Sequence, residues 1–496
     1  MADNPLDAPL LQIKNSTRNT LDEWSIRNAV EGVQIFGGIG SGKTSGSGAV
    51  LARKYLEHGF GGLVLTAKRD ETELWKEYCR TYNRLDDLVI ITPGGDHTFN
   101  FLDYEFSRSG KGAGLTDNIV NVLRTVIRAG HGDGQGRTNE GFWEDALDML
   151  LFNTVDLATL AYGQLTIADL YQIVKHLPTS LRDVVPPAPN SRDPFASILY
   201  KAKLNVGKRA TARKRMFEET GQTGRTYTPN RDPEIRLYST LSHYFQSDFP
   251  GLSDKTRSVI EHSFYGFLFR LIRDPIRSLL CSETATVSPD DSLRGKIILI
   301  DLPVKLYDKV GRDAQILFKY IWQRAMERRD VRDNARPVFL WADEAQNFLH
   351  EHDIDYQATA RSSRVCTVYL TQNIPNYYTH MGGRDGEYRV KSFLGTMGTK
   401  MFHANADMVT NNYAAELFGK AMVEVENYSV SYTKEYQRTE GKSQIKDFIV
   451  PPEAFTRMRT GGPDLNYKVD VYIHRQGIPF FDGGRNFLKT TFTQNH

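Results

Sequence analysis

Short apolar runs alternate with amphipathic segments at the start of the chain. The apolar runs at residues 33–36, 63–65 and 88–91 predict strands, and the segments 43–58 and 70–82 between them predict helices. Strands that alternate with helices usually form a parallel sheet, because a parallel pair needs a crossover connection. This part of the chain therefore predicts the beginning of an α/β domain.

The same alternation returns near residue 296. Apolar runs at 296–301, 338–342, 366–371 and 400–403 predict four more strands, and the segment 312–329 predicts a long helix. These runs are almost continuously apolar, which is typical of strands buried on both faces. We therefore predict one sheet that is built from two separated parts of the chain.

Helical periodicity dominates between about residues 100 and 291. Residues 142–151 repeat apolar side chains at intervals of three and four, and Thr166 provides a hydroxyl cap for another helix. We expect the loops here to include the Gly-rich segment 130–136 and the basic run 201–215. The middle of the chain predicts a mostly helical domain inserted into the α/β core.

A phosphate-binding motif follows the first predicted strand. The sequence GGIGSGKT, residues 37–44, satisfies G-x-x-x-x-G-K-[ST] between a strand and a helix, which disfavours a chance match in a Gly-rich turn. Glycines let backbone N–H groups approach the phosphates, and the helix N-terminus favours negative charge. The candidate nucleotide-binding residues are Gly37, Gly38, Gly40, Ser41, Gly42, Lys43, Thr44 and Ser45.

The motif also assigns roles to individual side chains. Lys43 is expected to bridge the β- and γ-phosphates of ATP, and the Thr44 hydroxyl to bind Mg²⁺. The predicted fold class is α/β, a RecA-like P-loop ATPase core with a mainly parallel central sheet and an inserted all-α domain. The predicted domains are an N-terminal extension (1–25), a nucleotide-binding domain in two parts (26–105 and 291–496) and a mostly helical insertion (106–290).

An acidic pair, Asp343 and Glu344, ends the predicted strand 338–342. Ligands of open α/β sheets lie beyond the carboxyl ends of the strands. We therefore expect Asp343 to support Mg²⁺ and Glu344 to polarise the attacking water. The alternative, an acidic helix cap after a core strand, is disfavoured by the presence of the P-loop.

Gln372 and Arg361 are two further candidate catalytic residues. Gln372, just after the predicted strand 366–371, is suited to hydrogen-bond the γ-phosphate or orient the water, although a simple turn before Pro375 is the alternative. Arg361 is suited to reach the nucleotide of a neighbouring subunit, because its planar guanidinium matches a phosphate oxyanion. From the residues alone, a surface arginine is the simpler interpretation of Arg361.

The bulk composition sets outer limits on function. The chain has 496 residues, 40% hydrophobic and 25% charged, with a net charge of +2, so any DNA-binding surface must be local. Three well-separated cysteines indicate neither a disulfide framework nor a zinc site. Because no signal peptide or membrane-length apolar stretch is evident, we expect a cytoplasmic protein, or one held at the inner membrane through another protein.

The order of these motifs resembles the type IV coupling proteins, TraG/TraD-like DNA-transfer ATPases of the FtsK/HerA motor superfamily. Beyond the P-loop, the similar blocks are residues 91–93, 99–103, 142–143, 295–299, 341–345, 370–373, 399–402 and 449–455. The resemblance covers about residues 30–480. One departure is that members commonly begin with transmembrane helices, whereas no membrane-like segment precedes this P-loop strand.

The resemblance implies a homohexamer that hydrolyses ATP at subunit interfaces and holds single- or double-stranded DNA in its channel. Arg361 falls where the family's trans-acting finger lies, which favours that role, and Arg364 remains a second candidate. Relaxase, secretion-system or nuclease proteins are the implied partners. The basic run 201–215 is either a phosphate-binding surface or a solvated helix face offset by Glu218 and Glu219.

Three functions remain open on the sequence. The first is an ATP-driven DNA translocase of the coupling-protein type, serving conjugation or secretion. The second is a HerA-like cytoplasmic translocase or helicase that works with a nuclease in end processing or phage defence. The third is a docking ring in which ATP binding assembles the subunits and hydrolysis is incidental.

Overall fold

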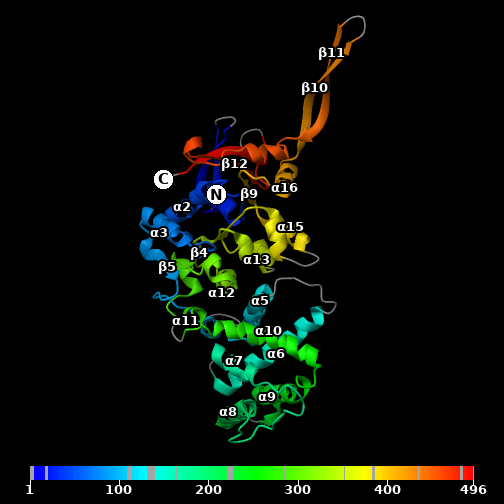
Figure 1. The fold of residues 1–496 in the computed structure, drawn as a ribbon. Helices are drawn as coiled ribbons and strands as arrows, with labels where there is room; N and C mark the ends of the chain where they lie inside the picture. Colours follow the sequence, from blue (N-terminus) through cyan, green and yellow to red (C-terminus); the bar gives the residue numbers. More distant parts are fainter. Residues whose placement is uncertain are drawn as a thin grey trace. The chain divides into compact units, whose positions relative to one another are not determined.

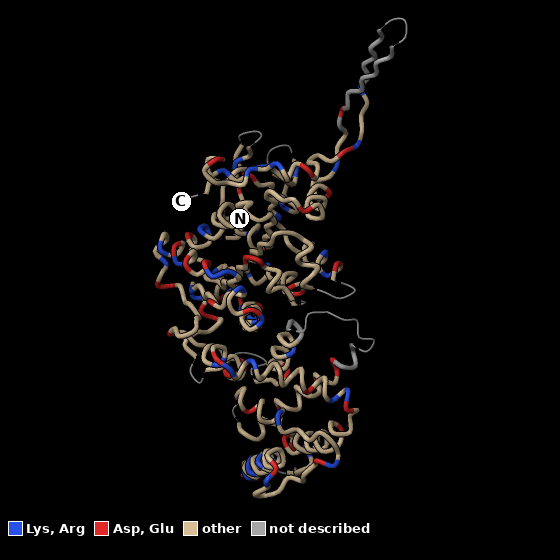
Figure 2. The backbone as a smooth tube through the Cα atoms, viewed as in Figure 1, with Lys and Arg blue, Asp and Glu red and all other residues tan. Residues whose placement is uncertain are grey.

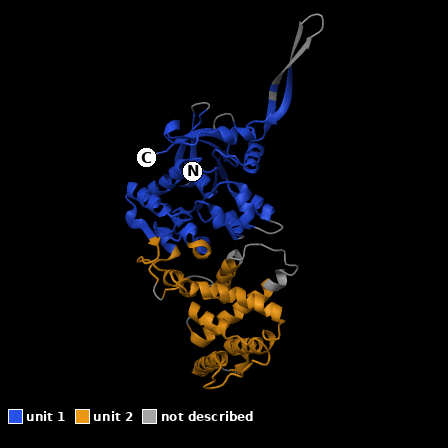
Figure 3. Ribbon diagram, viewed as in Figure 1, with its two compact units in different colours: residues 1–89, 290–306, 323–496 blue, residues 90–289, 307–322 orange. Residues whose placement is uncertain are grey.

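The computed structural model describes residues 5–494 except 17–19, 109–113, 131–139, 164, 220–226, 283–284, 351, 382–385, 433–435 and 481–483. The chain forms two compact units (Figure 3): unit 1 comprises residues 1–89, 290–306 and 323–496, and unit 2 comprises residues 90–289 and 307–322. The domain limits predicted from the sequence stay a proposal.

Unit 1 is built on a nine-stranded sheet, of which Figure 1 labels β4, β5, β9 and β12. The order of its strands is β13-β12-β9-β3-β8-β7-β4-β6-β5. The strands are β3 (Val33–Phe36), β4 (Gly61–Leu65), β5 (Leu88–Ile91), β6 (Ile297–Ile300), β7 (Val338–Ala342), β8 (Val365–Thr371), β9 (Thr399–Phe402), β12 (Lys468–Arg475) and β13 (Phe487–Thr493). Strand β3 pairs in parallel with β8 and β9, β7 pairs in parallel with β8, and β4 pairs in parallel with both β6 and β7.

The central strands are apolar because both faces of the sheet are covered. Every residue of β3, β4, β6, β7, β8 and β9 is buried. All seven predicted strands are present, and the predicted α/β class with a mainly parallel sheet is confirmed. The antiparallel pair β12 and β13 extends one edge of the sheet next to β9.

Helices follow the strands of unit 1 as the alternation predicts. They are α1 (Ile26–Val30), α2 (Ala49–Glu57), α3 (Glu71–Thr81), α13 (His352–Ala360), α14 (Ile374–Met381), α15 (Gly386–Thr396) and α16 (Met408–Phe418). A one-turn π-helix, Thr44–Gly48, precedes α2, and there the Gly48 N–H donates to the Lys43 carbonyl. Single π turns inside helices often mark functional sites.

Two antiparallel hairpins lie outside the main sheet. One pairs β1 (Pro9–Lys14) with β2 (Leu21–Ser25), within the segment predicted as an N-terminal extension. The other pairs β10 (Lys420–Tyr432) with β11 (Tyr436–Phe448) and forms a two-stranded sheet of its own in unit 1. The sequence analysis predicted neither hairpin.

Unit 2 is helical in the residues that the structure describes. Its helices are α4 (Phe101–Ser107), α5 (Thr116–Gly130), α6 (Glu140–Tyr162), α7 (Ile167–Lys175), α8 (Pro194–Glu219), α9 (Pro233–His243), α10 (Asp254–Leu271) and α11 (Ile276–Leu280). Helix α12 (Val304–Arg328) includes residues 307–322 of this unit and has a non-helical backbone at Asp308. Thr166 caps α7 as predicted, because its side chain accepts from the Asp169 N–H. The Gly-rich loop predicted at 130–136 falls almost wholly outside the described residues.

The basic run 201–215 belongs to α8, so the prediction of a loop there is wrong, whereas the alternative of a helix face predicted the right type of element. Ala202, Val206 and Ala210 recur at intervals of four and are buried, which gives the helix an apolar face. The remaining positions are mostly Lys, Arg and other residues that favour helices. Apolar residues do recur with the helical period in this run, but the many charged residues between them make the pattern hard to recognise in the sequence.

Unit 2 contains acidic as well as basic residues (Figure 2), and several basic side chains of α8 form ion pairs with acidic ones. Arg213 forms a bidentate pair with Asp232, with both N–O distances at 2.8 Å, and Arg209 pairs with Glu234 at 2.9 Å. The Arg213 hydrogen bond holds the pKa of Asp232 well below its usual range, against a smaller opposing effect of burial. These arginines are engaged in the fold of unit 2, which favours the structural interpretation over a phosphate-binding surface.

Candidate nucleotide-binding site

The Gly-rich loop between β3 and the π turn forms an open cradle. Gly40 and Gly42 have φ angles of +70° and +78°, in the left-handed region that favours glycine. A Cβ atom at Gly42 would lie 2.7 Å from a methyl group of Val469, whereas one at Gly40 would meet nothing within 4 Å. The buried Ser41 Oγ has no hydrogen-bond partner among the described residues. Such a cradle suits a phosphate group.

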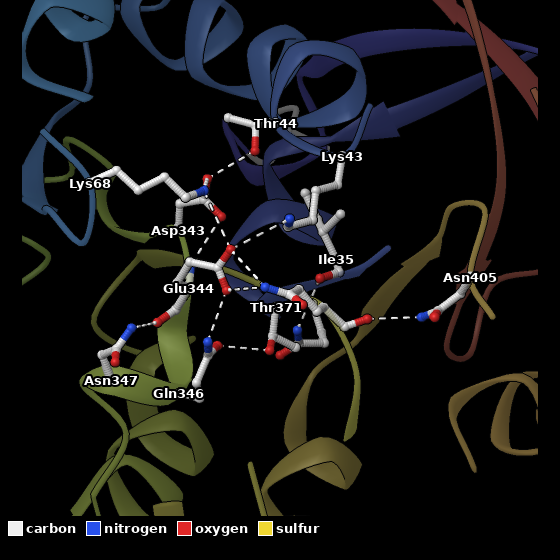
Figure 4. Close-up of polar contacts among 12 residues, drawn as sticks. Ile35, Lys43, Thr44, Lys68, Asp343, Glu344, Gln346, Asn347, Thr371 and Asn405 are labelled. Carbon is white, nitrogen blue, oxygen red and sulfur yellow. Dashed lines mark hydrogen bonds and ion pairs between the residues drawn. The ribbon is translucent and has the colours of Figure 1, made fainter. Parts of the chain in front are cut away.

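The acidic pair lies beside this loop, at the carboxyl end of β7 (Figure 4). The Thr44 hydroxyl donates to Asp343 Oδ2 at 2.9 Å, although these residues are separated by 299 positions in the sequence. The other carboxylate oxygen of Asp343 accepts from the Glu344 N–H at 2.9 Å. The structure thus brings together the two residues predicted to support Mg²⁺, and their hydroxyl and carboxylate oxygens are the ligands that this ion prefers.

Glu344 adopts a backbone conformation that is rare for a residue with a side chain. Its φ and ψ angles are 51° and 47°, in the left-handed region. Its carboxylate accepts from Gln346 Nε2 at 2.9 Å and lies 3.8 Å from Lys43 Nζ. The strained turn after β7 therefore directs the second carboxylate toward the P-loop lysine.

The surroundings of Glu344 favour the ionised carboxylate. Burial raises the pKa of Glu344, but the Gln346 hydrogen bond and the charges of Lys43 and Lys68 outweigh that effect, so the pKa lies below its ordinary value. A carboxylate that stays ionised near neutral pH can accept a hydrogen bond from a water molecule. This is the property that the predicted role of Glu344 requires.

Gln372 lies one residue beyond β8 and also reaches Glu344. Its Nε2 atom is 3.3 Å from each carboxylate oxygen of Glu344, and its backbone carbonyl accepts from Asn405 Nδ2 at 2.8 Å. The side chain thus points into the site between neighbouring strand ends. Its role in orienting water or the γ-phosphate remains a prediction.

The two candidate fingers lie elsewhere in unit 1. Arg361, just after α13, has a side chain that is 56% exposed and forms an ion pair with Glu31 at 3.5 Å. Arg364 has a φ angle of 49° and donates from Nη1 to the Ala335 carbonyl at 2.8 Å. Among the described residues, neither arginine forms a hydrogen bond or ion pair with the acidic pair, so a role at a nucleotide requires a second subunit or a rearrangement.

Two residues of the site were missed from the sequence. Lys68 contacts Asp343 Oδ2 at 3.2 Å and Glu344 Oε1 at 3.4 Å, and Glu71 lies behind it at the start of α3. Burial, followed by the charge of Asp343, raises the pKa of Glu71 to about 8. Both residues follow β4, whose carboxyl end lies beside that of β7. The pairing of β4 with β7, which the sequence does not show, is what brings these two residues to the edge of the sheet where ligands bind.

A cavity of about 10 Å³ lies between Glu71, Thr44 and Asp343, closed on its other sides mainly by Leu74, Trp75 and Trp341. Glu71 Oε1 is buried and has no partner among the described residues, while Oε2 accepts from the Ala67 N–H at 2.8 Å. About this volume is needed to hold one water molecule, and three polar groups are present. The acidic side of the site thus has room for an ordered water.

His403 links the P-loop helix to β9. It follows that strand, and its Nε2 atom lies 2.7 Å from the Ser47 hydroxyl in the π turn. Burial, with a smaller effect of the Lys43 charge, lowers the pKa of His403 to about 3. The imidazole is therefore neutral at physiological pH and acts as a structural hydrogen-bonding group.

This buried histidine predicts a loss of stability at acid pH. Between pH 6.5 and 3 the unfolded chain binds a proton at this residue that the folded chain excludes, so stability falls by about 1.4 kcal/mol per pH unit as the pH is lowered. Urea unfolding should show the free energy of unfolding falling about 2 kcal/mol less in His403→Gln than in the wild type between pH 7 and 5. His58→Gln at an exposed site is the control, and equal pH dependence in all three proteins would refute the assignment.

The site residues together fit ATP and Mg²⁺. The cradle at Gly40, the orphan Ser41 hydroxyl and the Lys43 ammonium suit a phosphate chain. The Thr44 hydroxyl and the Asp343 carboxylate suit a hard divalent cation. Glu344 lies close to Lys43, where the terminal phosphate is expected, and Gln372 contacts Glu344.

One family model matches part of the chain. Residues 337–460 match the family model described as "TraM recognition site of TraD and TraG". The matched segment contains Asp343, Glu344, Arg361 and Gln372. A search of curated proteins found no significant match.

Solved structures match over almost the whole chain. The bacterial conjugative coupling protein TrwBdeltaN70 in its unbound form matches with a TM-score of 0.60 and 13% identity, covering 98% of this chain and 89% of that one. The plasmid coupling protein TrwB in complex with ADP and Mg²⁺ matches with a TM-score of 0.59 and 13% identity over 100% and 96% of the two chains. The complex of TrwB with the non-hydrolysable ATP analogue ADPNP matches with a TM-score of 0.58 and 13% identity, covering 100% of this chain and 96% of that one.

These matches confirm the resemblance to the coupling proteins, in the fold of the whole chain and in the segment 337–460. They also confirm the predicted fold class, because the chain shares its fold with these coupling proteins. Within the described part of the chain, no helix is both long enough and apolar enough to cross a membrane.

Proposed function

We propose that this protein is an ATP-driven DNA translocase of the type IV coupling protein kind, which moves DNA with any attached protein in conjugative transfer or secretion. One observation carries the proposal. Lys43, Thr44, Asp343, Glu344 and Gln372 converge on one site within a fold that matches a conjugative coupling protein over almost its whole length. No specific feature of the described residues favours the nuclease-linked motor.

The named complexes of TrwB with ADPNP and with ADP and Mg²⁺ support ATP and Mg²⁺ as the ligands of this chain. Lys43 would hold the β- and γ-phosphates, while Thr44 and Asp343 would hold the metal, whose charge helps to neutralise the phosphates. Glu344 would accept a hydrogen bond from the attacking water, and the Gln372 amide would orient it. The glycines of the cradle would leave the backbone N–H groups accessible to phosphate oxygens.

A homohexameric ring accounts for the position of Arg361. This residue is exposed and lies apart from the acidic pair of its own chain, which is where a group that serves a neighbouring site would be expected. In such a ring Arg361 of one subunit stabilises the charge that develops on the phosphates held by the next. Arg364, with its guanidinium bound to a backbone carbonyl, is the less favoured candidate.

Mixing two inactive variants tests the trans arrangement. Arg361→Ala subunits keep Lys43, and Lys43→Ala subunits keep Arg361, so an interface between them contains one complete site. Equal mixtures should recover about a quarter of the wild-type ATPase rate, because a quarter of random ring interfaces join the two variants in the productive order. Arg364→Ala in place of Arg361→Ala is the control, and an inactive mixture in every ratio would refute a trans role.

DNA dependence of ATP hydrolysis distinguishes a motor from a docking ring. We expect single- or double-stranded DNA to raise the steady-state ATPase rate about tenfold or more. A motor couples ATP hydrolysis to movement along DNA, so bound DNA must change the rate of a step in the ATPase cycle. The rate is measured with each form of DNA at two salt concentrations, since phosphate contacts weaken with salt. A rate that neither form changes would favour a docking ring.

We further propose that the segment 337–460 contains a surface for a partner protein of the transfer machinery. The printed description of its family model, a recognition site for TraM in TraD and TraG, supports this. Relaxase or secretion-system proteins are the other partners proposed. In this scheme the protein is cytoplasmic, and attachment to the inner membrane occurs through such a partner.

A further inference from the structure

The Lys68 ammonium group occupies a central position in the acidic part of the site. Lys68 lies in the short segment between β4 and α3, and its Nζ atom contacts Asp343 Oδ2 at 3.2 Å and Glu344 Oε1 at 3.4 Å. In Figure 4 Lys68 and Lys43 approach Glu344 from two sides. Lys68 is the lysine that reaches the carboxylate predicted to support the metal.

Two buried carboxylates make this region attractive to a cation. Asp343 and Glu344 are adjacent in the sequence, and both side chains are almost fully buried. The Lys68 ammonium group lies 3.2 Å from an oxygen of Asp343 and 3.4 Å from an oxygen of Glu344, so it places a positive charge next to both carboxylates.

The same carboxylate oxygen is shared between Lys68 and the predicted metal site. Asp343 Oδ2 accepts from both Thr44 Oγ1, at 2.9 Å, and Lys68 Nζ, at 3.2 Å, while Oδ1 accepts from a backbone N–H. A magnesium ion held by Thr44 and Asp343, directly or through water, would lie close to Oδ2. Two cations at that separation repel each other strongly in a partly buried site.

The Lys68 side chain is free to leave. It is 38% exposed, in contrast to Asp343 and Glu344 at 4% and 8%. Its four-carbon stem has rotatable bonds, and an ammonium group is readily solvated. Lys68 lies on a different backbone segment from Asp343, Glu344 and Thr44. Its side chain can therefore withdraw without movement of β7 or of the P-loop.

We propose that Lys68 is a tethered counter-cation, which neutralises Asp343 and Glu344 while the site lacks a metal and competes with Mg²⁺ for that place. The inference rests on the proposed nucleotide site and adds a positioning residue to it. In the nucleotide-free chain, the ammonium group pairs with carboxylates that would otherwise be buried without a counter-charge. When the metal enters, it displaces the ammonium group. Binding of the metal–nucleotide complex is thereby coupled to withdrawal of the Lys68 side chain from the two carboxylates.

The test is the magnesium dependence of ADP binding. A fluorescent ADP is titrated into wild type, Lys68→Met and Lys68→Arg at a series of free Mg²⁺ concentrations, beginning in EDTA. Removal of the competing charge should lower the Mg²⁺ concentration for half-maximal enhancement of binding by at least about fivefold in Lys68→Met. Lys68→Arg keeps the charge and should resemble the wild type more closely. Lys76→Met, which removes an equal charge from the exposed face of α3, is the matched control.

A second readout needs no nucleotide. Mg²⁺ alone should raise the thermal midpoint of Lys68→Met at concentrations that leave the wild type almost unchanged, because only the variant has an empty cation place. Equal half-maximal Mg²⁺ concentrations in wild type and Lys68→Met would overturn the inference while leaving the nucleotide site intact. If wild-type ADP binding does not respond to Mg²⁺, the proposed nucleotide site fails as well.

Discussion

Replacing Lys43 by alanine is expected to reduce the affinity for ATP by about a hundredfold or more and to abolish hydrolysis. The Lys43 ammonium group lies 3.8 Å from Glu344 at the mouth of the Gly-rich cradle, where it faces the predicted position of the β- and γ-phosphates. Loss of one buried charge–charge contact of this kind costs about 3 kcal/mol, which corresponds to about two orders of magnitude in affinity. Fluorescent-nucleotide titration measures the first effect and phosphate release the second.

The matched control for Lys43 is Lys54→Ala. Lys54 lies on α2, the helix that continues from the π turn after the P-loop, and its ammonium group pairs with Glu57 at 2.8 Å on the surface. It has the same charge but no access to the cradle, so nucleotide affinity should be unchanged within a factor of two. If both variants bind ATP like the wild type, the phosphate site is wrongly placed.

Glu344→Gln is expected to separate binding from hydrolysis. The substitution keeps the shape of the side chain and its hydrogen-bonding capacity toward Gln346, but removes the negative charge that would accept a proton or a hydrogen bond from the attacking water. The rate of hydrolysis should fall by about 10² to 10⁴, the range found when a positioned general base is removed. Affinity for ATP should be unchanged or higher, because Lys43 and Lys68 lose a competing carboxylate.

The comparison is single-turnover hydrolysis together with equilibrium binding. Glu73→Gln is the control, since Glu73 is exposed on α3 and pairs with Lys76. A Glu344→Gln variant that hydrolyses ATP at the wild-type rate would show that another group activates the water. Gln372, whose amide contacts the same carboxylate, would then be the first alternative to examine.

The sequence was informative where a local pattern has one physical solution. Apolar runs such as 338–342 can be satisfied only in a covered sheet, and the P-loop pattern requires a strand before it and a helix after it. The strand-end rule then pointed to Asp343 and Gln372, and in the structure Asp343 contacts Thr44 while Gln372 contacts Glu344. The type of each central element and one side of the site were therefore predictable.

The remaining features depend on contacts between distant segments. Strands β12 and β13 contain alternating polar residues, and β12 becomes a sheet strand through antiparallel pairing with β9. Val469 of β12 packs against Gly42 of the P-loop, a contact between residues that the sequence does not relate. The backbone of Glu344 adopts left-handed φ and ψ angles, which residues other than glycine rarely do. Nothing in the local sequence predicts this conformation at a glutamate.

Lys68 was missed for a different reason. It follows β4 directly after two small residues, and a lone lysine at that point is ordinary on any protein surface. Only the pairing of β4 with β7, which places Lys68 beside Asp343, gives it significance. The sheet order, and not the local sequence, assigns its chemistry.

Movement along DNA is the most direct test of the central claim. Streptavidin is bound to biotin at one end of single-stranded or double-stranded DNA, and its release is followed after addition of protein and ATP with free biotin as a trap. We predict ATP-dependent release from at least one DNA form by the wild type, and none by Glu344→Gln, which binds ATP but does not hydrolyse it. A wild-type protein that hydrolyses ATP yet releases streptavidin from neither form, at either end, would contradict the assignment as a DNA translocase.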